Sequence, residues 1–236
     1  MRSKLFSILI LIIFVITSII SPVADKMIPI TAEVDASREL INLNFHTINF
    51  TKFNQFIKSI TSQDKGNQLV GLIAPDHFNL AIIQQPTGRP DFVSNELEVV
   101  TEFSLTKQYG SIGLLAHNHL AGAYFSSLKE NDLIVLVSDN KKFSYYKIEK
   151  ILSYQALSPN SPHSNFVNLN DSSRILSALD LFMEIYTQEG SLVIQTCIAQ
   201  GDEPSWGRLF IRAIPISDIG IEQLINFQVP YMHVSS

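Results

Sequence analysis

Short segments rich in β-branched and aromatic residues recur through the last two thirds of the chain, and this recurrence limits its fold more than any other feature. Gly, Pro, Asn or Asp bounds each segment, which is the pattern of strands and turns. So many strands in a short chain favour a closed sheet, which has no exposed edges. We therefore predict an all-β fold, a closed or nearly closed eight-stranded β-barrel with strands at residues 69–74, 78–84, 99–103, 111–117, 133–137, 143–151, 192–198 and 208–214.

The strand pattern is interrupted by two segments with helical spacing, so one or two short helices are expected. Apolar residues follow Thr51 at helical intervals up to Ile60, and the Thr51 hydroxyl is placed to cap this helix. A second helix is predicted at residues 175–186, with caps at residues 171–173. Residues 158–164, which include two prolines, are expected to form a loop.

The N-terminus resembles a membrane-targeting segment. Arg2 and Lys4 precede a nearly unbroken apolar run from Leu5 to Ile20, which is typical of a secretory signal or an uncleaved anchor. Pro22 makes cleavage just after this run unfavourable, so we expect a retained single-pass anchor with a cytoplasmic N-terminus and an extracytoplasmic domain. If the signal is cleaved, the protein is secreted instead.

The chain is thus expected to have three parts: a signal-anchor or transmembrane segment at residues 1–21, a stalk at 22–50 and one globular domain at 51–236. The formal net charge is −5 and no basic run follows the N-terminus, so nucleic acid is excluded as a partner. The only cysteine is Cys197, which rules out an intramolecular disulfide. In an oxidising compartment, such a thiol is either buried or used.

Cys197 is the candidate nucleophile. Side chains alternate along a strand, so Cys197 shares a face with Gln195, and the more apolar face of Ile194 and Thr196 turns to the core. An antiparallel hairpin would bring Arg208 beside the strand end that carries Cys197. Arg208 is therefore the candidate for stabilising negative charge, with Arg212 as a less favoured substitute.

A thiol attacks as the thiolate, and a neighbouring imidazole can activate it and later protonate a leaving amine. His117 is the candidate for this role, because it ends a predicted strand at the rim of the barrel. His119 is the rival, since residues two apart in an extended segment face the same way.

These residues carry a resemblance to a known family, the sortases. The sequence Leu114-Leu115-Ala116-His117 is similar to the family's histidine motif, and Val193-Ile194-Gln195-Thr196-Cys197 is similar to its TLxTC strand. Arg208 follows the cysteine at about the family's interval, and the resemblance covers about residues 65–216. Two positions depart from the pattern, since Val193 replaces a hydroxyl residue and Asn131 replaces the glycine of a Gly-Asp turn.

The resemblance implies a cysteine transpeptidase that cleaves a C-terminal sorting signal of secreted proteins through a thioester acyl-enzyme. An amine on a cell-wall precursor or a protein subunit then accepts the acyl group. Cys197, His117 and Arg208 would be catalytic, while Thr196, Trp206 and His119 are weaker candidates for substrate contact. No cofactor or metal is expected.

Three alternatives remain open at this point. The domain could be a noncatalytic sortase-like module that binds a partner. It could bind zinc through His117, His119 and Cys197, which are plausible ligand types. Within the enzyme class, water could resolve the thioester in place of an amine, which would make the protein a peptidase.

Overall fold

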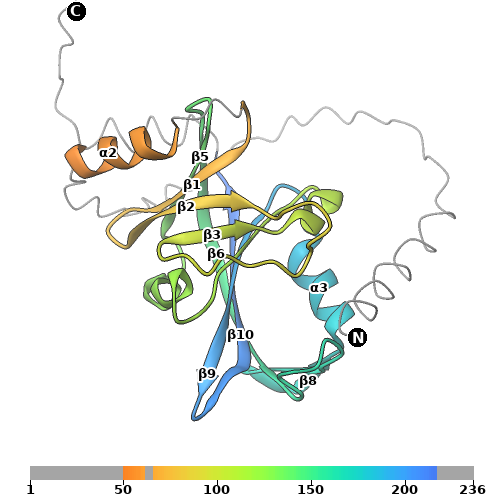
Figure 1. The fold of residues 1–236 in the computed structure, drawn as a ribbon. Helices are drawn as coiled ribbons and strands as arrows, with labels where there is room; N and C mark the ends of the chain where they lie inside the picture. Colours follow the sequence, from red (N-terminus) through yellow and green to blue (C-terminus); the bar gives the residue numbers. More distant parts are fainter. Residues whose placement is uncertain (1–49, 62–65, 217–236) are drawn as a thin grey trace, which may run out of the picture. The chain divides into compact units, whose positions relative to one another are not determined.

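The computed structural model describes residues 50–61 and 66–216 (Figure 1). The expected anchor at 1–21 and the expected stalk up to residue 49 lie outside these residues, and so does the C-terminal part of the predicted domain from residue 217. Within the described ranges, no helix has the length and apolar character needed to cross a membrane.

The strands close into a barrel. Eight of them pair in the order β10-β9-β4-β3-β2-β1-β5-β6, and β10 also pairs with β6, which closes the circle. The pairs β2–β3 and β4–β9 are parallel, whereas the other pairs are antiparallel. The predicted eight-stranded barrel is therefore confirmed, with strands β1 Leu69–Ala74, β2 Phe78–Gln84, β3 Val99–Glu102, β4 Ile112–Leu115, β5 Leu133–Ser138, β6 Phe143–Ala156, β9 Leu192–Gln200 and β10 Glu203–Pro215.

Alternating apolar residues fill the barrel and explain why these segments form strands. Inward side chains from all eight strands make one continuous core, since burying them removes apolar surface from water; examples are Leu72, Leu80, Val100, Leu114, Ile134, Ile148, Ile194 and Ile211. Strand β1 is buried on both faces, because its outward residues Val70 and Ile73 lie under helix α2.

Helix α2 spans Phe50–Ile60 and packs its apolar stripe on the outside of the barrel. The ring of Phe53 stacks on Phe143 of β6 with the centroids 6.4 Å apart. The predicted helix is confirmed, but Thr51 lies inside its first turn, so the expected cap at this residue is wrong.

The structure corrects the prediction between residues 158 and 186. Residues 158–164 form the expected loop, but a β-hairpin of β7 (Phe166–Asn168) and β8 (Asp171–Leu176) follows it and extends the sheet from β6. Helix α3 begins later, at Ala178–Tyr186, and its N-cap is Ser177, whose hydroxyl accepts a hydrogen bond from the backbone N–H of Asp180. The caps predicted at 171–173 are wrong because these residues belong to β8.

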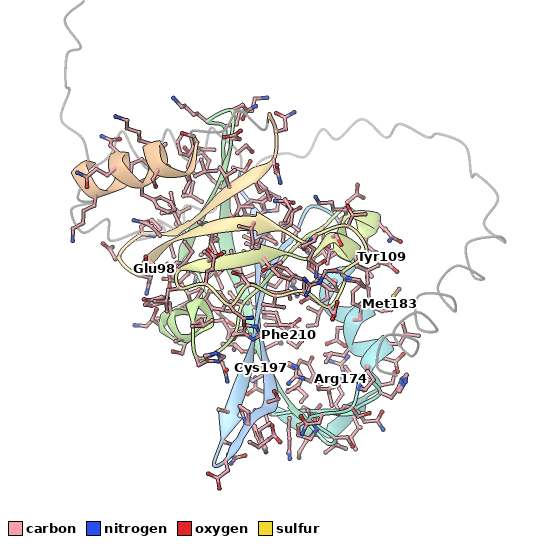
Figure 2. All side chains as sticks on the ribbon, viewed as in Figure 1. Glu98, Tyr109, Arg174, Met183, Cys197 and Phe210 are labelled. Atoms are coloured by element: carbon pink, nitrogen blue, oxygen red, sulfur yellow. The ribbon has the colours of Figure 1, made fainter. Side chains whose placement is uncertain are left out.

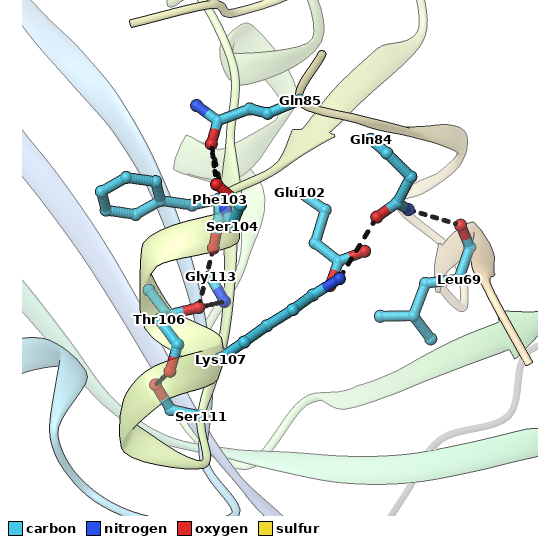
Figure 3. A network of polar contacts seen from close by, with 10 residues as sticks. All are labelled: Leu69, Gln84, Gln85, Glu102, Phe103, Ser104, Thr106, Lys107, Ser111 and Gly113. Carbon is cyan, nitrogen blue, oxygen red and sulfur yellow. Dashed lines mark hydrogen bonds and ion pairs between the residues drawn. The ribbon is translucent and has the colours of Figure 1, made fainter. Parts of the chain in front are cut away.

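A 3₁₀-helix, η2 (Ser104–Tyr109), joins β3 to β4 through buried polar contacts (Figure 3). The Thr106 hydroxyl donates to the Phe103 carbonyl at 2.9 Å and accepts from the Gly113 N–H at 2.9 Å. Lys107 Nζ pairs with the buried carboxylate of Glu102 at 2.8 Å. These contacts fix the start of β4, which leads to His117.

The turn before β5 contains Asn131, which stands where the sequence pattern described above has a glycine. Asn131 has a φ of 76°, in the left-handed region that glycine adopts without strain. Its N–H donates to the Ile148 carbonyl at 2.8 Å. Asparagine is one of the few other residues that tolerate this conformation, which explains how it can replace glycine here.

Candidate active site

Cys197, labelled in Figure 2, lies on β9. Strand β9 is paired with β4 on one side and with β10 on the other. The direct partner of Cys197 across the antiparallel β9–β10 pair is Arg208. Directly opposite residues project from the same face of a sheet, so the thiol and the guanidinium share one face. Cys197 is half-buried. The strand continues to Gln200, so the cysteine lies inside the strand near its end.

The predicted alternation along β9 is seen in the burial of its side chains. Ile194 and Thr196 are buried, and Ile194 belongs to the barrel core. On the other face, Val193 packs in a separate core cluster with Ile185 of α3. The amide oxygen of Gln195 accepts a hydrogen bond from the Tyr186 hydroxyl of α3. Helix α3 therefore covers the outward face of β9 at Val193 and Gln195, and this face is more open at Cys197.

His117 follows the end of β4 on the other side of β9. Leu115 is in register with Gln195 in this parallel pair, and the Ala116 N–H donates to the Gln195 carbonyl at 3.1 Å. Continuing the register by two residues puts His117 level with Cys197. Cys197 and Arg208 are directly paired, and His117 reaches their level by this continuation of the β4–β9 register.

Thr196 holds the His117 segment against β9. Its buried hydroxyl donates to the Ala116 carbonyl at 2.9 Å. The His117 carbonyl accepts from the N–H groups of Leu120 and Gly122, each at 3.0 Å. A Cβ at Gly122 would lie 2.2 Å from Thr196 Oγ1 and 2.7 Å from the His117 carbonyl oxygen, so only glycine fits there. Thr196 therefore contacts the backbone beside His117.

The pKa of His117 is lowered, first because burial disfavours the charged imidazolium and second because of the charge of His119. A hydrogen bond to the backbone of Val93 opposes this shift. The His119 ring stacks on the His117 ring with centroids 5.5 Å apart, and His119 is exposed. His117 is therefore mostly neutral at neutral pH and held in a defined orientation, while His119 faces solvent.

Arg208 is held by backbone carbonyls and an aromatic ring. Its Nη1 donates to the carbonyls of Ser205 and Gly207, each at 2.9 Å. Its Cζ lies 6.0 Å from the ring centroid of Phe166 on β7. Arg212, the substitute candidate, pairs instead with Glu149 at 2.9 Å and lies in register with Val193, away from Cys197.

Trp206 is half-buried in the irregular part of β10, between Glu203 and Gly207, where the register with β9 shifts. The Asn118 side chain crosses to this segment and donates to the Pro204 carbonyl at 2.9 Å. Asn118 thus links the His117 loop to the strand that carries Arg208.

Three residues that contact the candidate site residues or their segments were not predicted, namely Asn118, Val93 and Phe166. Asn118 could have been suspected from its place between the two histidines. Val93 acts through its backbone, which gives no signal in the sequence, and Phe166 lies in a strand that was not predicted.

The zinc alternative requires at least three ligands. In the described part of the chain, no three His, Cys, Asp or Glu side chains are grouped so that they could hold a metal ion. His117 and His119 are stacked on one another.

The described domain is a closed mixed β-barrel that carries the Cys197 thiol, the His117 imidazole and the Arg208 guanidinium on neighbouring chain segments. No family model and no curated protein sequence matches the chain. Among solved structures, Listeria monocytogenes sortase A matches with 11% identity and a TM-score of 0.41, over 64% of this chain and 89% of that one.

Two sortases of another type match similarly. Sortase C-1 from Actinomyces oris has 14% identity and a TM-score of 0.44, over 69% of this chain and 80% of its own. Clostridium perfringens sortase C, solved with the C-terminal cell wall sorting motif, has 16% identity and a TM-score of 0.42, over 75% and 94%. All three of these solved structures are sortases, with identities below 25% and TM-scores below 0.5.

Proposed function

We propose that this protein is a membrane-anchored, extracytoplasmic cysteine transpeptidase of the sortase type. The observation that carries this proposal is the strand register: it pairs Cys197 with Arg208 and, continued two residues past the end of β4, puts His117 level with Cys197. A nucleophile, an acid/base group and a fixed cation on one face are the three functions that acyl transfer through a thioester requires. The order of these residues in the sequence, which resembles that of sortases, supports the same reaction.

In the first half of the reaction, neutral His117 takes the proton of the Cys197 thiol, and the resulting thiolate attacks the carbonyl carbon of the scissile peptide bond. The tetrahedral intermediate collapses, its C–N bond breaks, and the leaving amine takes a proton from the His117 imidazolium. The product is a thioester between Cys197 and the N-terminal part of the substrate. In the second half, an amine attacks this thioester, gives a proton to neutral His117 and releases the thiolate.

The surroundings of His117 suit both proton transfers. Partial burial and the neighbouring His119 lower its pKa, so the neutral ring that accepts a proton is well populated at neutral pH. Its hydrogen bond to the Val93 backbone fixes the ring orientation. The Thr196 and Gly122 contacts fix the backbone on either side of the ring.

Arg208 is assigned to the negative charge that develops on the substrate carbonyl oxygen. Its donors are pre-oriented by the Ser205 and Gly207 carbonyls, so little reorganisation is needed in the transition state. Removing one such donor in an acyl-transfer site typically lowers kcat by about 10²- to 10³-fold. Arg208→Ala is therefore expected to fall in this range.

The proposed substrates are secreted proteins with a C-terminal sorting motif, and the acceptor is an amine of a cell-wall precursor or a protein subunit. The apolar run at residues 5–20 supports attachment to the membrane with the barrel outside. A free thiol without a disulfide partner also fits an exported enzyme that uses its cysteine.

The first test needs no substrate. The full chain in detergent is alkylated with iodoacetamide over a range of pH, and its single cysteine makes the rate specific for Cys197. The wild-type rate should show a titration that is lost in His117→Ala and kept in His119→Ala and Arg208→Ala. A thiol that reacts only after denaturation would refute the proposal.

The second test identifies the acceptor. Peptides carrying candidate sorting motifs are incubated with the protein, with and without an added amine, and the products are identified by mass spectrometry. An amide with the added amine supports transpeptidation, whereas a free carboxylate in both samples indicates a peptidase. A bound peptide that is never cleaved would indicate a noncatalytic binding domain.

A further inference from the structure

The loop between β2 and β3 contacts the His117 ring through its backbone. The ring is hydrogen-bonded to the backbone of Val93, and this bond raises the pKa of His117 against the net shift. A hydrogen bond raises a histidine pKa when the ring donates it, because it then favours the protonated form. The Val93 carbonyl is therefore the acceptor, and one ring nitrogen of His117 directs its proton toward Val93.

Val93 and Cys197 lie on opposite sides of the His117 segment. In the sheet, β4 lies between β9, which carries Cys197, and β3. The Ser94 N–H donates to the Thr101 hydroxyl of β3 at 2.9 Å, which places the Val93 segment on the β3 side. Thr101 is paired with the β4 residue two positions before His117. Continuing the alternation past the end of β4 puts the Thr101 and His117 side chains on one face of the sheet.

The Val93 bond decides where the lone pair of the ring lies. A neutral imidazole has one N–H and one lone pair, and a hydrogen bond at one nitrogen selects the tautomer. With the N–H bonded to Val93, the other nitrogen carries the lone pair. The proposed reaction begins when this lone pair takes the proton of the Cys197 thiol. In other enzymes that pair a nucleophile with histidine, a carboxylate side chain often has the orienting role that a backbone carbonyl has here.

Gln85, which follows β2, holds the loop on the N-terminal side of Val93. Its side-chain amide donates to the carbonyls of Pro90 at 2.9 Å and Phe92 at 3.1 Å. Its amide oxygen accepts from the N–H and the hydroxyl of Ser104 at 3.0 and 2.9 Å (Figure 3). Both donors and both lone pairs of the amide are thus used. The peptide group between Phe92 and Val93 is therefore tied to the start of η2.

Thr101 holds the loop on the C-terminal side of Val93. Its hydroxyl accepts from the Ser94 N–H, and both residues are buried. Without this hydroxyl the N–H would be buried and unpaired, so the contact is costly to break. The Ser94 hydroxyl in turn accepts from the Glu96 N–H at 3.1 Å, which fixes the following turn. The Val93 carbonyl thus lies between two anchored peptide groups.

We propose that the Val93 carbonyl fixes the tautomer of the His117 ring, and that Gln85 and Thr101 are positioning residues that hold this carbonyl in place. This inference rests on the proposed function, because it assigns a purpose to the lone pair of neutral His117. It gives the loop between β2 and β3 a part in proton transfer, although none of its side chains is assigned to contact the reacting atoms.

The test follows the ring nitrogens of His117 by NMR. The full chain is labelled with isotopic histidine and measured in detergent, and His117→Ala identifies the signals. The nitrogen shifts report which nitrogen carries the proton. In the wild type one tautomer should exceed the other about fivefold, the effect of one net hydrogen bond. In Thr101→Val and in Gln85→Met this ratio should fall about twofold or more, because the carbonyl is no longer held.

The direction of the pKa change separates positioning from a merely structural role. The bond to Val93 raises the pKa of His117, so displacing the carbonyl should lower that pKa further. A variant that only loosens the site would let water reach the ring. The pKa would then rise toward its ordinary value of about 6.5, because burial is the largest cause of the lowered value.

Two matched variants serve as controls. Thr101→Ser keeps the hydroxyl and should keep the wild-type tautomer ratio and pKa. Gln84→Met removes the same amide group from the neighbouring residue, whose Nε2 donates to the Leu69 carbonyl of β1 at 3.1 Å. It should leave the tautomer ratio and the pKa of His117 unchanged.

A folded variant with the wild-type ratio, or with a raised pKa, would remove its residue from the positioning role. That result in both Thr101→Val and Gln85→Met would overturn the inference and leave the proposed function standing. If Thr101→Val does not unfold cooperatively, Gln85→Met decides alone. Alkylation of the same samples with iodoacetamide tests the proposed function separately. A wild-type Cys197 that reacts only after denaturation would refute that function, whatever the tautomer of His117.

Discussion

Arg208 lies directly opposite Cys197 in the antiparallel pair of β9 and β10. Side chains at directly opposed positions have Cβ atoms about 4.5 to 5.5 Å apart, and they point the same way. The separation of the two Cβ atoms is therefore fixed by backbone hydrogen bonds and does not depend on the conformation of a loop. Only His117 enters the site from a loop, and its neighbours carry most of the contacts that hold it.

The first prediction concerns the charge next to His117. The positive charge of His119 contributes to the lowered pKa of His117, so His119→Gln should raise that pKa. Burial is the larger cause and remains, so the pKa should stay below the ordinary value of about 6.5. The ring nitrogens of His117 are followed by NMR as the pH is changed. His163→Gln, in an exposed loop, is the control, and a pKa that falls or stays constant in His119→Gln would contradict the prediction.

The second prediction concerns the hydroxyl of Thr196. Thr196→Val keeps the shape of the side chain but leaves the buried Ala116 carbonyl without this donor. An unsatisfied buried group costs about 1 to 3 kcal/mol, so the free energy of unfolding should fall by that amount in urea. The alkylation titration assigned to His117 should also weaken, because the adjacent backbone is released.

Two further variants serve as controls for Thr196→Val. Thr196→Ser keeps the donor and should retain the titration. Thr187→Val removes a hydroxyl that bonds to the Met183 carbonyl at 2.6 Å in an exposed setting, and it should cost far less. A stability loss in Thr196→Val with an unchanged titration would show that Thr196 supports the fold without positioning His117.

The third prediction concerns the left-handed residue Asn131. Asn131→Gly removes the side chain at a φ of 76° and should change the free energy of unfolding by less than about 0.5 kcal/mol. Asn131→Ala should lower it by about 1 kcal/mol, because a Cβ is unfavourable in this conformation. Urea denaturation measures both, with exposed Glu130→Ala as the control. Equal stabilities for the Gly and Ala variants would contradict this explanation.

The fourth prediction concerns alkaline pH. Burial, followed by the hydrogen bond to Glu184, raises the pKa of Tyr154 to about 12. The unfolded chain ionises this tyrosine near pH 10, so the stability it contributes is present below pH 10 and is lost as the pH rises toward 12. Tyr154→Phe should therefore unfold with a weaker dependence on pH in this window.

Thermal unfolding at several alkaline pH values measures this dependence. Tyr124→Phe is the control, because the Tyr124 ring is 42% exposed. An equal pH dependence in wild type and Tyr154→Phe would show that Tyr154 ionises alike in the folded and unfolded states.

Sequence reasoning predicted the barrel because its strands obey one simple rule. Residues such as Leu72, Leu114 and Ile194 point inward at every second position, and turns rich in Gly, Asn and Asp separate them. The same alternation predicted which face of the sheet carries Cys197, and the expected hairpin of β9 and β10 predicted that Arg208 lies beside it. Local periodicity carried this information, so a single chain was sufficient.

The β7–β8 hairpin could not be predicted in this way. Residues 171–175 of β8 are all exposed, so they lack the buried alternation that marks a strand. Ile175 and Leu176 also continue the helical spacing of α3, which moved the predicted helix start too early. Pairing of β8 with β7 is a tertiary effect that overrides this local pattern.

The closure of the barrel decides how a polypeptide can approach the thiol. Strand β9 is paired with β4 as far as Gln195 and with β10 at Cys197 itself, so β10 occupies one side of the β9 backbone beside Cys197. A substrate therefore cannot add to β9 as a strand on the β10 side. Among the described strands, the outer side of β8 is the one open edge, and the charges of Asp171 and Arg174 there discourage pairing with a stray chain.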